Sequence, residues 1–463
     1  MKNLTLSNIA KAVQGRLVAS NPIEVEAASV EIDSRKVIPG GIFIATKGER
    51  VDGHDFIKQV EEKGALGVIC EKEPKECEIP YILVEDSFQA LKDLAAYYRQ
   101  QLSIPIICIT GSVGKTSTKE FIAGTLAAKY NVCKTQGNFN NEVGMPLTLL
   151  SIREEHEIAV VEMGISHFGE MERMADIAKP DTCVITNIGQ CHLENLVDRD
   201  GVLKAKTAML DYMNPDGAIF FNGDDDKLET VSPPWNREIT HFGMLNTNDI
   251  YATDIVNKGL WGSDIIININ DAVKRTFPER IKVHVPLPGR HMIYNAMAAC
   301  GVAMEYSLSE EEIVRGIESV QATEGRSHVV AAPQYTLIDD CYNANPVSMK
   351  AAIDLLGMAN TRKVAILGDM FELGENEKEL HKEVGEYAMT HGMDVLITIG
   401  KLSLNMYEGA LMTAMSEACE IYTFETNEEA MEKLPEILKK DDSILIKASH
   451  GMHFDTIVDF LNK

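Results

Sequence analysis

The stretch "CITGSVGKTSTKE", from Cys108 to Glu120, decides how the middle of this 463-residue chain is expected to fold. It continues the apolar run "IPIICIT" and leads into the helix-like run "KTSTKEFIAGTLAAKY". That order predicts a buried strand, a glycine loop and a helix. The loop nearly matches the phosphate-binding pattern G-x-x-x-x-G-K-[ST], but Ile109 stands in the place of the first glycine. We therefore expect an atypical phosphate-binding loop.

The residues of this loop suit a nucleotide phosphate. Gly111 and Gly114 let the backbone approach a ligand, and the start of the following helix adds a positive field. Lys115 can reach the terminal phosphates, and the Thr116 hydroxyl can bind a magnesium ion. The alternative is a plain helix entry capped by a serine, which the order of strand, loop and helix disfavours. The expected ATP contacts here are Gly111, Ser112, Val113, Gly114, Lys115, Thr116 and Ser117.

The composition is that of an ordinary globular protein, with 45% hydrophobic and 25% charged residues. A formal net charge of -26, without a Lys/Arg-rich stripe, argues against a nucleic-acid partner. We recognise no signal peptide and no membrane-spanning run, and the nine cysteines are scattered without metal-binding spacing. We expect a cytoplasmic monomer that does not insert into membranes.

The length suggests about three domains, and the pattern of apolar and helical runs changes twice along the sequence. Residues 1–103 carry short β-like runs and close with the amphipathic helix "SFQALKDLAAYYRQQ". Residues 104–322 alternate apolar runs with helical patterns, as in a parallel sheet covered by helices, and include a β-rich insert at about 239–285. Residues 323–463 predict an open doubly wound sheet from the runs "YTLIDD", "KVAILGD", "DVLITIG", "CEIYTF" and "SILIKAS". The expected fold class is α/β throughout.

Polar residues at the ends of the expected central strands are candidates for the site. Glu162 ends the run "VVEM", and a carboxylate there suits a magnesium ion beside Thr116, although an ordinary strand-end carboxylate is the equal alternative. His192 follows a later strand, and Lys204 and Lys206 lie on an expected helix. A lone histidine or lysine is most often a core or solvated residue, so composition does not single these out.

Read together, these motifs resemble the Mur ligase family, which comprises ATP-dependent amide-forming ligases of peptidoglycan synthesis. The family's shortened loop has the form T-G-x-x-G-K-[ST], which is found here from Thr110 to Thr116. The resemblance covers nearly the whole chain. It is most specific in four segments: "DSRKVIPGGIFIATKGERVDGHDF", "TQGNFNNEVGMPLTLL", "DDCYNANPVSM" and "LGDMFELG".

Those segments point to the branch of the family that joins D-alanyl-D-alanine to UDP-N-acetylmuramoyl-tripeptide. The resemblance implies an N-terminal α/β domain that binds the uridine nucleotide, a central ATPase-like domain and a C-terminal Rossmann-like domain. ATP would be the co-substrate, and an acyl phosphate the intermediate. The implied products are UDP-N-acetylmuramoyl-pentapeptide, ADP and phosphate.

The resemblance also implies a role for individual residues. The catalytic set would be Lys115, Glu162, His192 and Lys206. Two Mg2+ ions would be held by Thr116, Glu162, His192 and a carbamylated Lys206. Further ATP contacts would be His291, Asn295, Arg326 and Asp340. The uridine nucleotide would contact Ser34, Arg35, Lys47 and Gly48, and the peptide substrates would contact Asn138, Asn140, Asn141, Tyr342, Asn343, Asn345 and Ser348.

The chain departs from the family pattern at three positions. Met292 stands where asparagine is common, Ala208 replaces a frequent acidic residue, and His450 replaces an expected arginine. Two rival functions remain open from the sequence. One is another ligase of the superfamily, such as a folylpolyglutamate synthetase or a different Mur enzyme, and the other is a non-catalytic nucleotide-binding scaffold.

Overall fold

The structure, a computed structural model, describes residues 1–19, 24–48, 51–75, 77–189, 191–232, 237–270, 277–321, 328–371, 373–413 and 419–463. It contains three β-sheets. Residue contacts divide it into two compact units: Met1–Asp254 with Ile266–Val283 and His291–Ser319, and Ile255–Ile265 with His284–Arg290 and Val320–Lys463. The α/β fold class with three sheets is confirmed.

The first sheet belongs to the first unit and has five strands in the order β1-β5-β4-β3-β2. Its strands are β1 (Arg16–Val18), β2 (Val30–Glu31), β3 (Ile42–Ile44), β4 (Gly67–Cys70) and β5 (Tyr81–Leu83). Neighbouring strands are parallel except for β1, which pairs antiparallel with β5. The helices of this part are α1 (Leu6–Ala12), α2 (Ile57–Glu62) and α3 (Ser87–Gln101).

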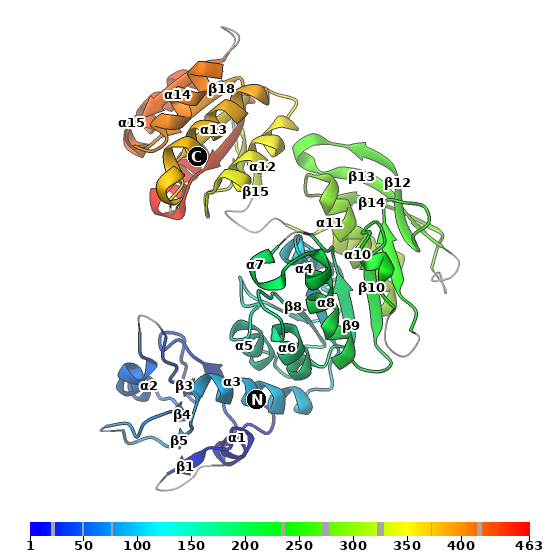
Figure 1. The fold of residues 1–463 in the computed structure, drawn as a ribbon, viewed down its shortest axis with the longest axis vertical. Coiled ribbons are helices and arrows are strands. Elements are labelled where there is room, and N and C mark those ends of the chain that lie inside the picture. Colours follow the sequence, from blue (N-terminus) through cyan, green and yellow to red (C-terminus); the bar gives the residue numbers. More distant parts are fainter. Residues whose placement is uncertain are drawn as a thin grey trace. The chain divides into compact units, whose positions relative to one another are not determined.

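The α3 helix joins the first sheet to the second. Its side-chain cap is Asp86, whose Oδ1 accepts from the N–H groups of Phe88 and Gln89, as expected at a helix start. The apolar face buries Leu91, Leu94, Ala95 and Tyr98, as the helical spacing predicted. Figure 1 shows α3 passing beside α5 and α6 of the central part, and one continuous hydrophobic core runs along it.

Two side chains at the end of α3 secure this junction. The Tyr98 hydroxyl donates to the Ile152 carbonyl oxygen at 2.7 Å. The Arg99 guanidinium donates to the Ala178 carbonyl oxygen at 2.7 Å and to Asp181 Oδ2 at 3.0 Å. The first two sheets are therefore linked by polar contacts as well as by core packing.

The second sheet has nine strands in the order β14-β13-β12-β11-β10-β9-β6-β8-β7. Its strands are β6 (Ile106–Thr110), β7 (Val132–Lys134), β8 (Ile158–Glu162), β9 (Thr182–Ile185), β10 (Ala218–Asn222), β11 (Thr240–Gly243), β12 (Ile250–Asn257), β13 (Ser263–Ile269) and β14 (Arg280–Val285). Its helices are α4 (Lys115–Leu126), α5 (Gly144–Leu150), α6 (Glu170–Ala178), α7 (Leu193–Leu196), α8 (Arg199–Thr207), α10 (Arg290–Glu305) and α11 (Glu310–Glu318).

The central position of β6 in the second sheet determines where the site lies. This strand is fully buried and runs parallel between β8 and β9. The loops that follow β6, β8 and β9 therefore leave the same edge of the sheet, where open α/β sheets bind their ligands. The phosphate loop, Glu162 and the segment before His192 are brought to this edge.

The third sheet has six strands in the order β15-β16-β20-β17-β18-β19. They are β15 (His328–Ala331), β16 (Thr336–Asp339), β17 (Lys363–Gly368), β18 (Val395–Ile399), β19 (Glu420–Phe424) and β20 (Ser443–Lys447). Each of the five apolar runs forms a parallel strand, as predicted. The sequence missed β15, a short edge strand that pairs antiparallel with β16.

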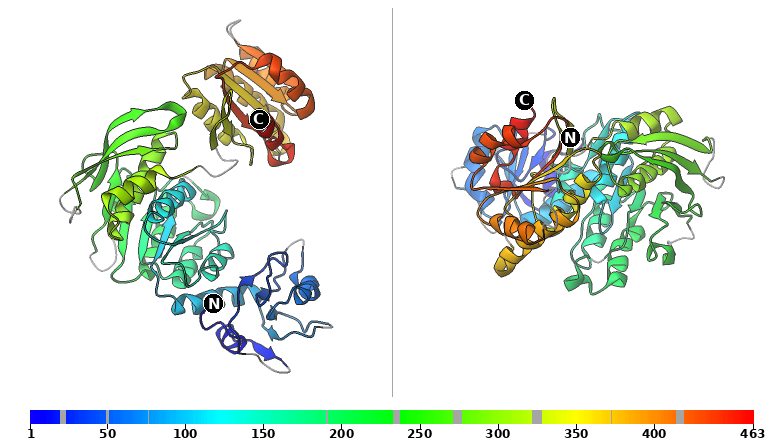
Figure 2. Two further views of the ribbon diagram at one scale, coloured as in Figure 1. Left: turned by 180° about the vertical axis from the view of Figure 1, so that it is seen from behind. Right: turned by 90° about the horizontal axis from the view of Figure 1, so that it is seen from above.

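Helices cover both faces of the third sheet, as Figure 2 shows. One hydrophobic core includes residues of α12 (Pro346–Gly357), α13 (Glu377–Thr390) and α14 (Leu404–Thr413), and a separate core includes residues of α15 (Asn427–Ile437) and α16 (Asp455–Leu461). The predicted boundary between residues 322 and 323 lies outside the described residues. No helix in the described part of the chain is long and apolar enough to cross a membrane.

Candidate active site

The phosphate loop follows β6 in a backbone shape that needs glycine. Gly111 has φ +154° and Gly114, which precedes α4, has φ +81°. A Cβ atom on Gly111 would lie 1.9 Å from Thr186 Oγ1 at the end of β9. Asn187 holds the loop from the same side, since its carbonyl oxygen accepts from the Ser112 N–H and its Oδ1 accepts from the Val113 N–H, both at 3.0 Å.

Gly111→Ala tests this loop. The added methyl group has to displace Thr186, and the positive φ strains alanine, a cost of about 1–3 kcal/mol. We expect at least tenfold weaker ADP binding, measured by calorimetry. Gly137→Ala is the control, because it also has a positive φ but a Cβ there would meet nothing within 4 Å. Equal ADP affinity in the two variants would show that the close approach to Thr186 is unimportant.

Lys115 begins α4 and lies over the loop. Its Nζ donates to the carbonyl oxygens of Gly111 at 2.8 Å and Ser112 at 3.4 Å. Burial lowers the pKa of Lys115, while the nearby Glu162 carboxylate acts in the opposite direction. The lysine is therefore a positive charge in a poorly solvated position, where its interaction with phosphate oxygens is strengthened.

Glu162, at the end of β8, is only 1% exposed. Its Oε1 accepts hydrogen bonds from the Thr116 hydroxyl at 3.2 Å and from Asn140 Nδ2 at 2.7 Å. Its Oε2 is buried and has no hydrogen-bond partner among the described residues. A buried carboxylate oxygen without a hydrogen bond is costly, and a hard cation bound beside the Thr116 hydroxyl would satisfy it. The pair therefore fits a Mg2+ ion.

His192 and Lys206 form a second part of this edge. His192 lies just before α7 with φ +51°, and Lys206 lies in the last turn of α8 with 1% exposure. Burial, followed by the charges of Lys206 and Lys115, lowers the pKa of His192, which favours the neutral imidazole that binds metals. Burial and then Lys115 lower the pKa of Lys206 to about 8. A lysine with that pKa is partly unprotonated near neutral pH and can react with carbon dioxide.

No group of three or more His, Cys, Asp or Glu side chains that could hold a metal is found in the described ranges. The expected ligand set contains only two such residues, Glu162 and His192. Its other members are a threonine hydroxyl and a modified lysine. The expected site would therefore not contain a group of three His, Cys, Asp or Glu ligands.

The α10 helix approaches the phosphate-loop helix through Asn295. This residue is 5% exposed, and its Oδ1 accepts a hydrogen bond from the Thr118 hydroxyl at 2.8 Å. Its Nδ2 donates to the weak acceptor Met292 Sδ at 3.4 Å. Burial lowers the pKa of His291 at the start of the same helix. The structure thus brings Asn295 to α4, where a nucleotide contact was predicted.

The expected uridine-nucleotide residues lie beyond β2 and β3, which are parallel neighbours. Ser34 donates to Gln59 Oε1 at 3.2 Å, and Arg35 pairs with Asp33 at 2.8 Å. Lys47 forms an isolated β-bridge with Asp52, and the Gly48 N–H donates to the Val51 carbonyl oxygen at 2.9 Å. Both segments leave the carboxyl edge of the first sheet, which is where a ligand is expected.

The three expected peptide contacts after β7 differ in their surroundings. Asn140 holds Glu162, as described above. Asn141 Oδ1 accepts from the Gly144 N–H at 2.9 Å and so supports the start of α5. Asn138 is exposed. Only Asn140 is therefore in direct contact with the predicted cation ligands.

The third sheet carries a buried ion pair at its carboxyl edge. Asp340 Oδ2, after β16, lies 2.7 Å from Lys447 Nζ at the end of β20. Lys447 is 2% exposed and also donates to the Asn343 carbonyl oxygen at 2.8 Å. The sequence had not singled out Lys447, although a basic residue directly after a buried run was a usable signal. Arg326 lies outside the described residues.

The remaining expected peptide residues lie around the start of α12. Asn345 and Ser348 cap this helix reciprocally, since the Ser348 N–H donates to Asn345 Oδ1 at 2.8 Å and the Asn345 N–H donates to Ser348 Oγ at 3.0 Å. The Tyr342 ring is 52% exposed and lies 6.1 Å from the His450 ring. Tyr342, Asn343 and Asn345 are exposed, whereas Ser348 is half-buried.

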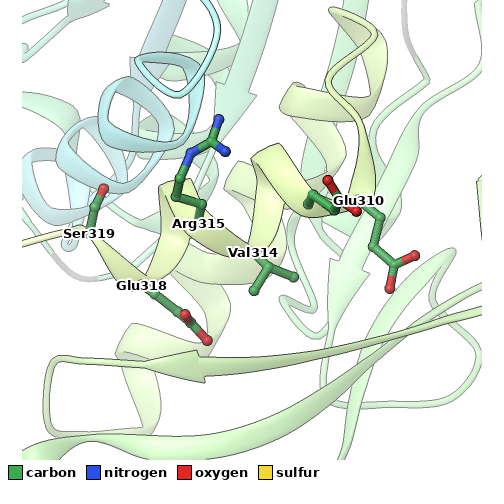
Figure 3. A pocket seen from close by; sticks show the side chains of 6 residues that line it. Glu310, Val314, Arg315, Glu318 and Ser319 are labelled. Atoms are coloured by element: carbon green, nitrogen blue, oxygen red, sulfur yellow. The ribbon is translucent and has the colours of Figure 1, made fainter.

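A hollow along α11 is unrelated to this chemistry. Its lining consists of Glu310, Glu311, Val314, Arg315, Glu318 and Ser319. Figure 3 shows Arg315 and Glu318 pointing in different directions, and Arg315 donates to the Ala128 carbonyl oxygen at 3.0 Å. Three carboxylates beside one engaged arginine would repel a nucleotide phosphate.

Comparison with known proteins identifies the family of this chain. Three family descriptions match the chain in order: "Mur ligase family, catalytic domain" at residues 26–99, "Mur ligase middle domain" at 109–303 and "Mur ligase, glutamate ligase domain" at 325–450. The UDP-N-acetylmuramoyl-tripeptide–D-alanyl-D-alanine ligase of Bacillus subtilis is 36% identical over 98% of this chain and 97% of its own length. The chain belongs to the Mur ligase family.

Solved Mur ligase structures have the same architecture. A crystal structure of MurF from Acinetobacter baumannii matches with a TM-score of 0.87 and 32% identity, and covers 99% of both chains. MurF from Thermotoga maritima in complex with ADP matches with a TM-score of 0.72 and 27% identity over 94% of this chain and 97% of its own. The three-sheet arrangement is therefore that of this family.

Proposed function

We propose that this Mur ligase joins D-alanyl-D-alanine to UDP-N-acetylmuramoyl-tripeptide at the expense of ATP, giving UDP-N-acetylmuramoyl-pentapeptide, ADP and phosphate. The observation that carries the proposal is the 36% identity to a ligase of that name over 98% of the chain. That similarity extends over the segments expected to bind the substrates as well as over the phosphate loop. It therefore supports the choice of substrates as well as the use of ATP.

The reaction has to activate a carboxylate, because an amine does not displace oxide from a carboxylate at a useful rate. One oxygen of the tripeptide's terminal carboxylate attacks the ATP γ-phosphorus, and the bond to ADP breaks. The unprotonated amine of the dipeptide then attacks the carbonyl carbon of the acyl phosphate. An amide bond forms, the carbon–oxygen bond to phosphate breaks, and the amine loses a proton. No nucleophilic side chain is needed.

The protein's task is placement and charge neutralisation. The loop from Gly111 to Ser117 offers backbone N–H groups and the N-terminal end of α4 to the phosphates. Lys115 adds a cation where the transferred phosphoryl group gains charge. Thr116 and Glu162 would hold one Mg2+ ion, and His192 and carbamylated Lys206 a second. Bound Mg2+ would neutralise phosphate charge and polarise the transferred group.

The substrate contacts follow the predicted sets. Ser34, Arg35, Lys47 and Gly48 would hold the uridine nucleotide at the first sheet. Asn138, Asn140 and Asn141 would line the path of the tripeptide toward Glu162. His291, Asn295, Arg326 and Asp340 would complete the nucleotide contacts, and Tyr342, Asn343, Asn345 and Ser348 would contact the peptide substrates.

We also propose that the protein works as a cytoplasmic monomer. All nine cysteines lie in the described part of the chain and are free, which suits a reducing compartment. ATP and the UDP-linked substrate are both soluble. Gel filtration with light scattering would test the oligomeric state.

A phosphate-release assay tests the proposed activity. The protein is given ATP, Mg2+ and UDP-N-acetylmuramoyl-tripeptides with lysine or diaminopimelate, with D-alanyl-D-alanine compared to D-alanyl-D-lactate. We expect release only when tripeptide and dipeptide are both present, with a clear preference for D-alanyl-D-alanine. Release with a folate and glutamate would favour the folylpolyglutamate synthetase alternative. Nucleotide binding without release in any mixture would favour a scaffold.

A further inference from the structure

A buried lysine lies behind the phosphate loop. Lys119 on α4 is 1% exposed, and its Nζ donates to the Thr135 carbonyl oxygen at 2.9 Å. Thr135 Oγ1 in turn accepts a hydrogen bond of 2.9 Å from the Glu162 N–H. Lys119 and Glu162 are thus held by the same threonine. Yet Lys119 Nζ remains 3.9 Å from Glu162 Oε2, which is too far for a hydrogen bond.

A second carboxylate accounts for this separation. Glu120 Oε1 lies 3.1 Å from Lys119 Nζ, and Glu120 Oε2 pairs with Lys134 Nζ. The series Lys134, Glu120, Lys119 and Glu162 alternates in charge from a side chain that is 38% exposed to one that is 2% exposed. Lys119 therefore pairs closely with Glu120 and only at the longer distance of 3.9 Å with Glu162.

This arrangement determines which groups can contact Glu162 Oε2. That oxygen is buried and finds no hydrogen-bond partner within the described ranges, although an ammonium group lies close by. An ammonium in contact with Oε2 would compete with a divalent cation for the same oxygen and would repel it. The closer pairing of Lys119 with Glu120 weakens that competition.

We propose that Glu120 is a positioning residue for the cation site. By retaining Lys119 in its own ion pair, it leaves Glu162 Oε2 available to a divalent cation. The inference rests on the proposed function, because it concerns the carboxylate that would hold Mg2+. Neither Glu120 nor Lys119 has to touch ATP or the metal for this role.

The test measures metal binding rather than turnover. Mn2+ replaces Mg2+, since it accepts the same oxygen ligands and can be followed by electron paramagnetic resonance in the presence of ADP. In Glu120→Gln, Lys119 loses its anionic partner and pairs with Glu162. We expect at least about tenfold weaker Mn2+ binding, as for the loss of one close charge interaction. Glu120→Asp keeps the charge and should recover most of the affinity.

Two further variants separate this role from a general structural effect. In Lys119→Met/Glu120→Gln the competitor is absent, so Mn2+ affinity should return to within about threefold of the parent. Glu157→Gln is the matched control, because it removes the same charge directly before β8, at the end of that strand opposite to Glu162. Glu157 Oε2 accepts from the Asn131 N–H, and its replacement should leave Mn2+ binding unchanged. Thermal unfolding of each variant reports on folding.

The outcomes distinguish the inference from the proposal on which it rests. Parent-like Mn2+ binding by Glu120→Gln overturns the inference alone. So does an equal loss in Glu120→Gln and in the double variant, because the loss then does not act through Lys119. Absence of ADP-dependent Mn2+ binding in the parent protein would overturn the proposed cation site and the inference together.

Discussion

Lys115→Ala is expected to reduce ADP release by at least about 1000-fold, while the protein remains folded. Lys115 is the first residue of α4, and because its ammonium is largely buried, water cannot easily replace its charge. Its hydrogen bonds go to two loop carbonyl oxygens and not to the core, so the loss of stability should be small. Steady-state ADP release and the melting temperature measure the two effects separately.

Lys129→Ala is the matched control for this prediction. Lys129 follows the other end of the same helix, is exposed, and donates to the Ser307 carbonyl oxygen. Its replacement removes the same charge from the chain without touching the loop. Near-normal turnover in Lys115→Ala would refute the role of the phosphate loop, whereas comparable losses in both variants would indicate a general effect of charge.

Lys206→Ala should lose most activity and regain part of it in acetate or formate. The lysine is buried and its pKa is lowered to about 8, mainly by burial. At pH 7 that pKa gives roughly 300-fold more neutral amine than an ordinary lysine has. The neutral Nζ can attack carbon dioxide, forming a carbon–nitrogen bond and releasing one proton. A small carboxylate can take the place of the resulting carbamate in the alanine variant.

The rate at which activity returns in bicarbonate should rise with pH. Because only the neutral amine reacts, protein freed of carbon dioxide should regain activity faster in bicarbonate at a fixed carbon dioxide level as the pH rises through about 8. Lys204→Ala, two residues earlier and exposed on the same helix, is the control and should behave like the parent. Full activity of Lys206→Ala without added carboxylate would show that carbamylation is not required.

Local patterns predicted much of this fold. The order of strand, loop and helix from Ile106 to Leu126 was predictable because glycines, an apolar run and a helical period coincide there. The five buried strands of the third sheet were predictable because parallel strands covered on both faces are continuously apolar. The short strands β7 and β15 were missed, since neither is a continuously buried apolar run.

The surroundings of the site were less accessible from the sequence. Lys119 follows Lys115 by one helical turn and looks like a solvated lysine, yet it is buried because β7 brings Thr135 beside α4. The contact of Asn295 with Thr118 joins residues that are 177 positions apart. Such contacts depend on how distant segments pack, and no local spacing reports on them.

The junction made by α3 has a consequence for substrate choice. Tyr98 and Arg99 tie the helix that follows the first sheet to the backbone beside the second, within one continuous core. A substrate anchored by its uridine end at the first sheet would therefore reach Glu162 across a span that the protein itself sets. The distance between the two sheets would therefore select the length of the peptide, and a peptide one residue too short would leave its carboxylate out of reach of the ATP phosphate.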